Sequence, residues 1–192
     1  MIKRELAFFV KYLIMKWRYR GRIWFRGAPA IYAFPGSKIL FNVSEGGNKI
    51  NIFSHPLSNM IGLNQRVIIV AKAGGHIEIN EGVCMSGCTI YSTDRIIIGR
   101  NTDIGAGCKI IDNDFHPLPY SFRHPKEQED KVKKRPITIG EGCFIGTHAI
   151  ILKGTVLGKN CVVGAGSVVS GEWPENSIIA GNPAKKIGEN QK

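Results

Sequence analysis

The chain has 192 residues, of which 43% are hydrophobic and 23 are glycine, and its formal net charge is +11. This length fits one globular domain with a buried core. The longest apolar stretch covers residues 6–15 and is interrupted by Lys11, whereas a membrane-spanning helix needs about 20 apolar residues, so we expect no transmembrane helix. Basic residues follow this stretch in place of a small-residue cleavage site, which argues against a signal peptide and for a cytoplasmic protein.

The first 26 residues are strongly basic. They contain eight Lys or Arg side chains and one Glu, a net charge of +7, which leaves +4 for the rest of the chain. The rest is therefore too weakly basic to predict a nucleic-acid-binding surface. Within residues 2–19, apolar and basic side chains alternate at helical spacing, which predicts a basic amphipathic helix within residues 1–26. Two roles remain open for it: contact with an anionic lipid surface, or packing on the rest of the protein or across a subunit contact.

A period of six residues runs through two blocks of the chain. In seven hexads the first position is aliphatic, the second is glycine in six of the seven, and the fifth is small in all of them. The hexads begin at Ile98, Ile104, Ile139, Ile145, Ile151, Leu157 and Val163.

This period is neither helical nor that of a simple amphipathic strand. It predicts a chain that turns a corner every six residues, so that three flat sides close one coil about every 18 residues and the coils stack. One aliphatic side chain per hexad would point inward, and glycine at the second position would permit the tight corner. Before Ile77 the period is weak, and we expect residues 38–76 to form irregular early coils.

Five cysteines occur without a CxxC pair, which argues against a disulfide framework and against a structural zinc site. Cys108, Cys143 and Cys161 all occupy the small fifth position of a hexad. We therefore interpret them as small buried residues rather than reactive thiols.

The period breaks between Ile110 and Ile139, which lie 29 positions apart, and this is not a multiple of six. The inserted residues 111–138 include four prolines and eleven charged side chains, so we expect a protruding loop. Long loops inside a compact domain are often functional. The start of this one reads Asp-Asn-Asp-Phe-His-Pro-Leu over residues 112–118, which places two carboxylates and His116 close together.

The C-terminal part ends the repeat at Trp173-Pro174, and residues 180–185 then read Ala-Gly-Asn-Pro-Ala-Lys. Together with the hexads and the histidine at the break, this run resembles the hexapeptide-repeat acyltransferases, in particular those that O-acetylate sugars and exopolysaccharides. The resemblance is strong from about Ile77 to Ile187. It implies an all-β fold, a left-handed parallel β-helix shaped like a triangular prism, although general crossover rules favour the right hand. The prism would span residues 27–187, with the loop insertion 111–138 and a tail at 188–192.

The resemblance also implies roles for residues of the loop. The family's general base is a histidine at this point, and the matching residue is His116; imidazole, with an ordinary pKa of about 6.5, suits proton transfer from a hydroxyl. Asp114 would orient the ring or bind acceptor hydroxyls, and Asp112 is the next candidate, but both could equally be solvated loop carboxylates. Phe144 stands where many relatives place a tryptophan beside the acceptor pocket.

A groove for coenzyme A between neighbouring subunits of a homotrimer is a further implication of the resemblance. Its expected residues are Gly146, Thr147, Ala165, Ser170, Lys185 and Lys186. Gly171 and Gly188 depart from the family pattern, because relatives often carry Lys and Arg there. Lys186 or Lys159 is expected to replace the missing phosphate contacts.

The other histidines are weaker candidates for catalytic or metal-binding roles. His55 begins the same His-Pro-Leu tripeptide as His116, but it precedes the clean repeat and has no acidic run beside it, so we interpret it as structural. His124 and His148 raise the possibility of zinc, which prism-shaped γ-type carbonic anhydrases hold with three histidines between subunits. The close histidine pair of those enzymes is missing, and we expect no metal.

These observations predict an acetyl-CoA-dependent O-acetyltransferase that acts on a sugar hydroxyl in surface polysaccharide or lipopolysaccharide biosynthesis. Transfer would be direct, with His116 as base and a backbone N–H stabilising the oxyanion. The alternatives are acetylation of a small molecule such as serine or an antibiotic, and a non-catalytic hexapeptide-repeat scaffold. The acid-rich run around His116 favours an enzyme. A cytoplasmic location is expected, with peripheral contact at the inner face of the membrane through residues 1–26 left open.

Overall fold

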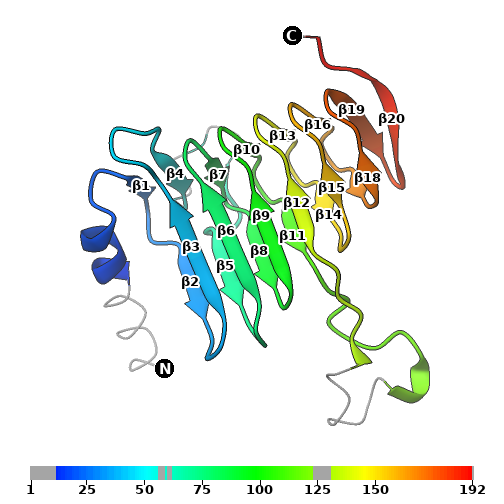
Figure 1. Cartoon of the computed structure of the whole chain (residues 1–192), viewed down its shortest axis with the longest axis horizontal. Coiled ribbons are helices and arrows are strands. Elements are labelled where there is room, and N and C mark those ends of the chain that lie inside the picture. Colours follow the sequence, from blue (N-terminus) through cyan, green and yellow to red (C-terminus); the bar gives the residue numbers. More distant parts are fainter. Residues whose placement is uncertain (1–11, 56–58, 60–61, 123–130, 192) are drawn as a thin grey trace.

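The chain winds around one axis as a triangular prism whose three walls are parallel β-sheets (Figure 1). The computed structural model describes residues 12–55, 59, 62–122 and 131–191. Successive strands belong to sheets A, B and C in turn, so each strand pairs with the strand one coil later. The three edges of the prism are therefore named A/B, B/C and C/A after the sheets they join.

The strands of the three walls are as follows. Sheet A contains β1 (Ile23–Arg26), β4 (Ile50–Phe53), β7 (Cys84–Ser86), β10 (Asp103–Ile104), β13 (Phe144–Ile145), β16 (Val162–Val163), β19 (Ser177–Gly181) and the antiparallel β20 (Ala184–Glu189). Sheet B contains β2 (Ala30–Ala33), β5 (Ile68–Ala71), β8 (Thr89–Ser92), β11 (Lys109–Ile111), β14 (Ile150–Ile151) and β17 (Val168–Val169). Sheet C contains β3 (Lys38–Asn42), β6 (His76–Asn80), β9 (Arg95–Ile98), β12 (Ile137–Ile139), β15 (Val156–Leu157) and β18 (Glu172–Trp173).

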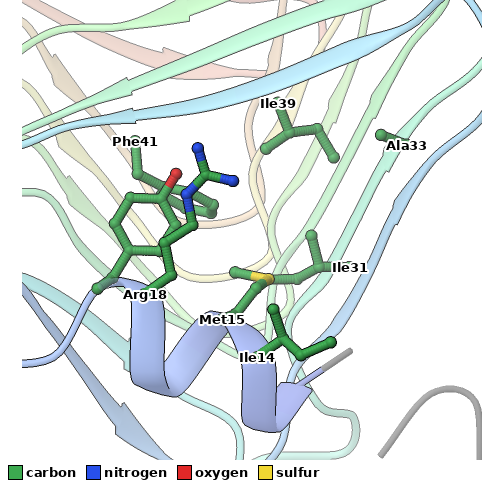
Figure 2. A pocket seen from close by; sticks show the side chains of 8 residues that line it. Ile14, Met15, Arg18, Ile31, Ala33, Ile39 and Phe41 are labelled. Atoms are coloured by element: carbon green, nitrogen blue, oxygen red, sulfur yellow. The ribbon is translucent and has the colours of Figure 1, made fainter. Parts of the chain in front are cut away.

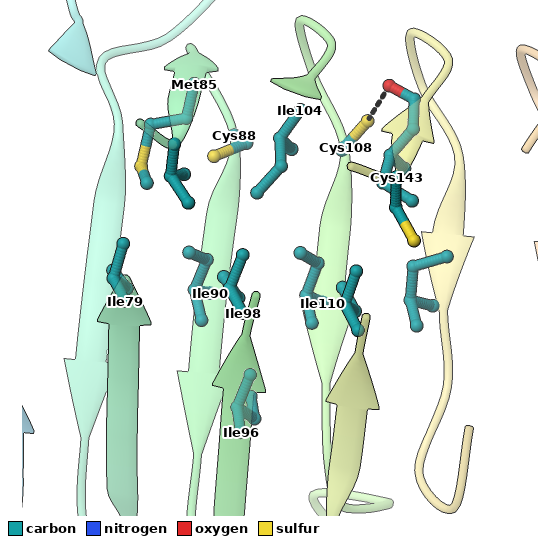
Figure 3. Close-up of a cluster of buried hydrophobic side chains, with 14 of the residues drawn as sticks. Ile79, Met85, Cys88, Ile90, Ile96, Ile98, Ile104, Cys108, Ile110 and Cys143 are labelled. Carbon is teal, nitrogen blue, oxygen red and sulfur yellow. Dashed lines mark hydrogen bonds between the residues drawn. The ribbon is translucent and has the colours of Figure 1, made fainter. Parts of the chain in front are cut away.

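The interior is a column of aliphatic side chains, one layer per coil (Figure 3). The first positions of the hexads are buried as expected, and in sheet C they stack directly, with Ile98 paired to Ile139 and Ile139 to Leu157. The fifth-position cysteines are also buried, which confirms their interpretation as small core residues.

Glycine at the second hexad position has a different cause from the one expected. These glycines do not have positive φ; a Cβ on Gly140 would lie 2.6 Å from the carbonyl carbon of Gly158 in the next coil. Glycine is thus required because adjacent coils approach each other closely at the corners. The left-handed backbone falls at the fourth position, at Asn101, Gly107, Gly142, His148, Gly154, Asn160 and Gly166.

The strands of the early coils pair regularly, so the expectation of irregular coils over residues 38–76 holds for their connections and not for their strands. Strands β3 to β5 alternate inward and outward residues, and Ile50, Ile52 and Ile69 are fully buried. The repeat is hidden there because the strands are four or five residues long and the connections 43–49 and 54–67 vary in length.

The two ends of the prism also differ from the expected boundaries. Residues 12–18 form a helix, but residues 23–26 form β1, so the prism begins before residue 27. The part of the expected helix in residues 1–11 lies outside the described residues. At the other end, β20 extends into the expected tail as far as Glu189. No helix in the described ranges is long and apolar enough to cross a membrane.

Candidate functional site

The insertion leaves the prism at the B/C edge, between β11 and β12, and projects away from the walls (Figure 1). Its two limbs are joined at their base, where the backbone N–H of Asp114 donates to the carbonyl of Lys133 at 3.0 Å and that of Arg135 donates to the carbonyl of Asp112 at 3.0 Å. Farther out, the loop contains a short 3-10 helix, η2 (Tyr120–Phe122). The site residues 112–116 therefore lie on an anchored part of the loop.

Asp112 is a buried carboxylate and not a solvated loop carboxylate, the alternative that the sequence left open. Its oxygens accept hydrogen bonds from the Ser92 hydroxyl at 2.5 Å, from the backbone N–H groups of Thr93 and Asp94 at 2.9 and 3.0 Å, and from the Asn113 amide at 3.0 Å. Four donors satisfy the carboxylate within the chain. It joins the start of the loop to the corner of the preceding coil.

Asp114 forms an ion pair with Lys153, which lies at the B/C corner of the following coil. The lysine binds Oδ1, while Oδ2 is buried and has no hydrogen-bond partner among the described residues. The carboxylate is thus directed at the prism rather than solvated. An unpartnered buried oxygen is unusual and marks Asp114 as a position with an unmet acceptor.

His116 is exposed at the end of a tight turn. Its backbone N–H donates to the carbonyl of Asp114 at 2.6 Å, and the intervening Phe115 has a φ of 58°, a left-handed conformation rare for a bulky side chain. The Phe115 ring lies 4.8 Å from that of Tyr91, centroid to centroid. The turn presents the imidazole of His116 to solvent.

A hollow of about 110 Å³ lies beneath this turn at the B/C edge. Tyr91, Asn113, Phe115 and Lys134 are among its lining residues. The Lys134 ammonium donates to the carbonyl of Thr93 at 3.1 Å, so it is held at the rim by a neutral group. The hollow combines aromatic, amide and cationic groups close to His116.

The remaining predicted residues are distributed over other parts of the prism. Phe144 points outward from β13, and Gly146, Thr147 and Ala165 follow at the A/B edge. Ser170, by contrast, lies at the B/C edge after β17. Lys185 and Lys186 are exposed on β20, where Lys186 binds Glu189 at 2.8 Å.

One chain therefore does not bring all the predicted residues together. His116 and Ser170 lie along one edge, whereas Gly146, Thr147 and Ala165 lie along another, with sheet B between them. Gly146 also has a packing role, because a Cβ there would lie 2.6 Å from the backbone nitrogen of Ala165. Thr147 donates its hydroxyl hydrogen to the carbonyl of Ala106 at 2.7 Å.

Three residues that contact residues 113–115 were not identified from the sequence: Tyr91, Lys134 and Lys153. Only Lys153 had a signal, because its hexad is the one of the seven without glycine at the second position. Tyr91 is brought to Phe115 by the stacking of coils and has no local pattern that identifies it.

The cysteines are unsuited to nucleophilic catalysis. Burial raises the pKa of the Cys84 and Cys108 thiols to about 11 and that of Cys143 to about 12. The Cys108 thiol also donates to the carbonyl of Gly146 in the next coil at 3.0 Å. Across the described ranges, no three His, Cys, Asp or Glu side chains are grouped as metal ligands would be.

Comparison with known proteins agrees with this geometry. A family model described as "Hexapeptide repeat of succinyl-transferase" matches residues 136–170. WbbJ of Escherichia coli K12, named as a candidate lipopolysaccharide biosynthesis O-acetyl transferase, is 36% identical over 116 residues, which cover 58% of this chain and 57% of WbbJ. The galactoside O-acetyltransferase of the same organism is 38% identical over 101 residues, 53% of this chain and 44% of that protein. The chain thus spans about half the length of these relatives.

A solved structure extends the match to most of the chain. The maltose O-acetyltransferase from Clostridium difficile 630 superposes with a TM-score of 0.60 at 27% identity, covering 80% of this chain and 72% of that one. The expected fold, a left-handed parallel β-helix built from hexapeptide repeats, is confirmed.

Proposed function

From the similarity of this chain to hexapeptide-repeat acyltransferases, we propose that it transfers an acetyl group from acetyl-CoA to a sugar hydroxyl. We further propose that the acceptor belongs to surface polysaccharide or lipopolysaccharide biosynthesis. The observation that carries the proposal is His116, an exposed imidazole on an anchored turn of the only long insertion between the hexads. The names of the relatives agree with a sugar acceptor.

His116 would act as the general base. Its imidazole takes the proton of the acceptor hydroxyl while the hydroxyl oxygen attacks the thioester carbonyl. The new C–O bond forms, the C–S bond breaks, and the proton passes from the imidazolium to the departing CoA thiolate. A backbone N–H would stabilise the negative charge on the carbonyl oxygen in between. The high pKa values of the buried cysteines favour this direct transfer over a covalent thioester on the enzyme.

Asp114 would act on this base indirectly. Its carboxylate faces Lys153, and its backbone carbonyl accepts from the N–H of His116. The ion pair therefore fixes the turn that carries the histidine. The unpartnered Oδ2 would be available to an acceptor hydroxyl that enters beside the loop.

The donor would bind along the A/B edge, where Gly146, Thr147 and Ala165 offer backbone groups and Phe144 an exposed ring. Because this edge is separated from His116 by sheet B within one chain, the complete site would require a neighbouring subunit. We propose a homotrimer in which the loop of one subunit meets the A/B edge of the next. Lys185 and Lys186 would contact CoA phosphates, and the ion pair of Lys186 with Glu189 would then break. Ser170 would lie at the same edge as His116.

The proposal is tested by measuring release of CoA thiol from acetyl-CoA with a panel of sugars, serine and antibiotics, on wild type and His116→Ala. Sugar-dependent release that is lost in the variant is expected. Release with serine or antibiotics alone would reassign the acceptor, and turnover unchanged in the variant would exclude His116 as the base. Light scattering on the same samples tests the trimer.

We also propose a cytoplasmic location, where acetyl-CoA is available, with the N-terminal segment as the part of the protein that contacts the inner face of the membrane.

A further inference from the structure

The exposed apolar side chains are concentrated at the N-terminal end of the prism. Of the fourteen large hydrophobic residues that are exposed in the described ranges, seven lie between positions 13 and 40. They are Leu13, Ile14, Trp17, Trp24, Tyr32, Phe34 and Leu40. Exposed apolar surface gathered in one region usually marks a contact with another surface.

The helix at residues 12–18 is divided into two faces. Met15 and Tyr19, four residues apart, pack against the core, and the Tyr19 ring contacts that of Phe41 at 5.6 Å. Leu13 and Trp17, also four residues apart, are exposed, and Trp17 has 80% of its surface accessible. One face thus covers the open end of the prism, and the other faces away from it with nothing from the described residues burying it.

The first coil continues this apolar surface around the prism. Trp24 is on sheet A, Tyr32 on sheet B and Leu40 on sheet C, so each wall carries an exposed large side chain next to the same end. The guanidinium of Arg26 lies 4.5 Å from the Trp24 ring centroid. We call these seven exposed residues, which belong to the helix and the first coil, the N-terminal apolar cap.

The segment that carries this cap is rich in basic residues and has no acidic ones. Residues 12–44 contain six cations and no Asp or Glu; the cations are Lys16, Arg18, Arg20, Arg22, Arg26 and Lys38. None of the ion pairs identified between described residues includes any of them. Aromatic side chains with cations that form no ion pair among the described residues are typical of a surface that binds anionic lipid.

A hollow of about 300 Å³ lies between the helix and the first coil (Figure 2). Ile14, Met15, Ile31 and Ile39 line it, and Arg18 extends over it. This arrangement suits an apolar chain with an anionic group at its end.

We infer that the N-terminal apolar cap docks on an anionic lipid bilayer, with the end of the prism facing the membrane. The inference deepens the membrane contact proposed above, and it holds or fails independently of the acetyl-transfer activity. The aromatic side chains would enter the interface, and the cations would bind lipid phosphates.

The test is flotation of the full-length protein with vesicles of phosphatidylcholine alone or with 30% phosphatidylglycerol. Binding only to the anionic vesicles, weakened by 0.5 M salt, is expected. Trp17→Ser should weaken binding by about 10-fold, and Arg20→Gln with Arg22→Gln by about 10- to 30-fold. Matched controls are Ile187→Ser, an exposed apolar residue on β20, and Arg95→Gln with Arg100→Gln; these should bind as wild type.

Several results would overturn the inference. These are no flotation of wild type, equal flotation with neutral vesicles, or equal losses in the control variants. Self-association that Trp17→Ser abolishes, in the absence of vesicle binding, would assign the cap to a protein contact instead. Turnover of a soluble acceptor by Trp17→Ser should match wild type, so failure of membrane binding and failure of the proposed enzyme activity give different results.

Discussion

The prism is built differently on the two sides of the loop. Before it, strands β1 to β6 are four or five residues long, and two of their connections, 43–49 and 54–67, contain more residues than the corners after the loop. After it, β13 to β18 are two residues long and are joined by short corners such as 146–149. Both regions bury the same kind of interior, with Ile52, Ile77, Ile145 and Ile151 fully inaccessible.

This difference separates two requirements of the fold. Filling the prism needs only an inward aliphatic side chain at each wall, and both regions supply it. The strict period of six arises where the corners between two-residue strands are short and uniform in length, and at their glycines adjacent coils approach closely enough to exclude a Cβ. The period is thus a property of corners rather than of the core.

The largest effect is expected from a comparison of the two His-Pro-Leu tripeptides, at residues 55–57 and 116–118. His116→Ala should lower kcat/KM for acetyl transfer by about 10²- to 10⁴-fold, because it removes the proposed base. His55→Ala, at the corresponding His-Pro-Leu of the early region, should retain wild-type turnover. Similar losses in both variants would show that the tripeptide acts through structure in either place.

Glycines should differ in their effect on stability according to how closely the next coil approaches them. Gly140→Ala places a Cβ 2.6 Å from backbone atoms of the next coil and should destabilise the fold by about 3 kcal/mol. In Gly46→Ala the new Cβ meets no atom within 4 Å, and only the positive φ of 74° is unfavourable for alanine. A destabilisation of about 1 kcal/mol is therefore expected. Urea unfolding with unchanged m-values measures both. Equal midpoints would contradict the close approach of coils as the reason for the repeat.

Loss of the ion pair at the loop base should affect activity more than stability. Lys153→Met removes the cation facing Asp114, so the turn carrying His116 should lose its position and kcat should fall about 10-fold. KM for acetyl-CoA should change little, and Lys153→Arg should restore part of kcat. Lys49→Met, at an exposed lysine of the early coils, serves as the control. An unchanged kcat in Lys153→Met would remove Asp114 from the positioning of the base.

The smallest effect concerns the thiols. Burial raises the pKa of Cys108 and Cys143 above that of an unfolded thiol, so their contribution to stability is complete below about pH 8.5 and decreases as pH rises toward 11. Thermal unfolding should occur at lower temperature at pH 10 than at pH 7.5. The double variant Cys108→Ala, Cys143→Ala should show a smaller decrease in unfolding temperature, because the two titrating thiols are removed. Alanine should fit there, since it occupies the same hexad position at Ala149. A decrease as large as in wild type would show that other groups cause it.

The sequence was most informative where local geometry repeats. The hexads predicted the walls, the inward residues and the position of the loop, because each depends on neighbours within six residues. The early coils were missed because their signal is alternation within longer strands, as at Ile50 and Ile52, with no fixed spacing between strands. The order of the chain alone does not reveal which corner will stack on which when the connections differ in length.

The site was predicted less completely, for a related reason. His116 was identified from the break and the resemblance, but the surroundings of the two carboxylates depend on other coils. Asp112 is buried by donors from residues 92–94, and Asp114 is paired with Lys153, 39 positions later. These contacts follow from stacking and are visible only once the coils are in register.

Strand β20 limits how far the stack of coils can extend. A stack of parallel coils ends in open strand edges, which could pair with another such stack, as in a fibril. At the C-terminal end, β20 turns back and pairs antiparallel with β19, with a register shift between Ile178 and Ile179. A further coil would need a parallel, evenly spaced partner in sheet A. The hairpin therefore acts as a terminator that keeps a repeating structure finite.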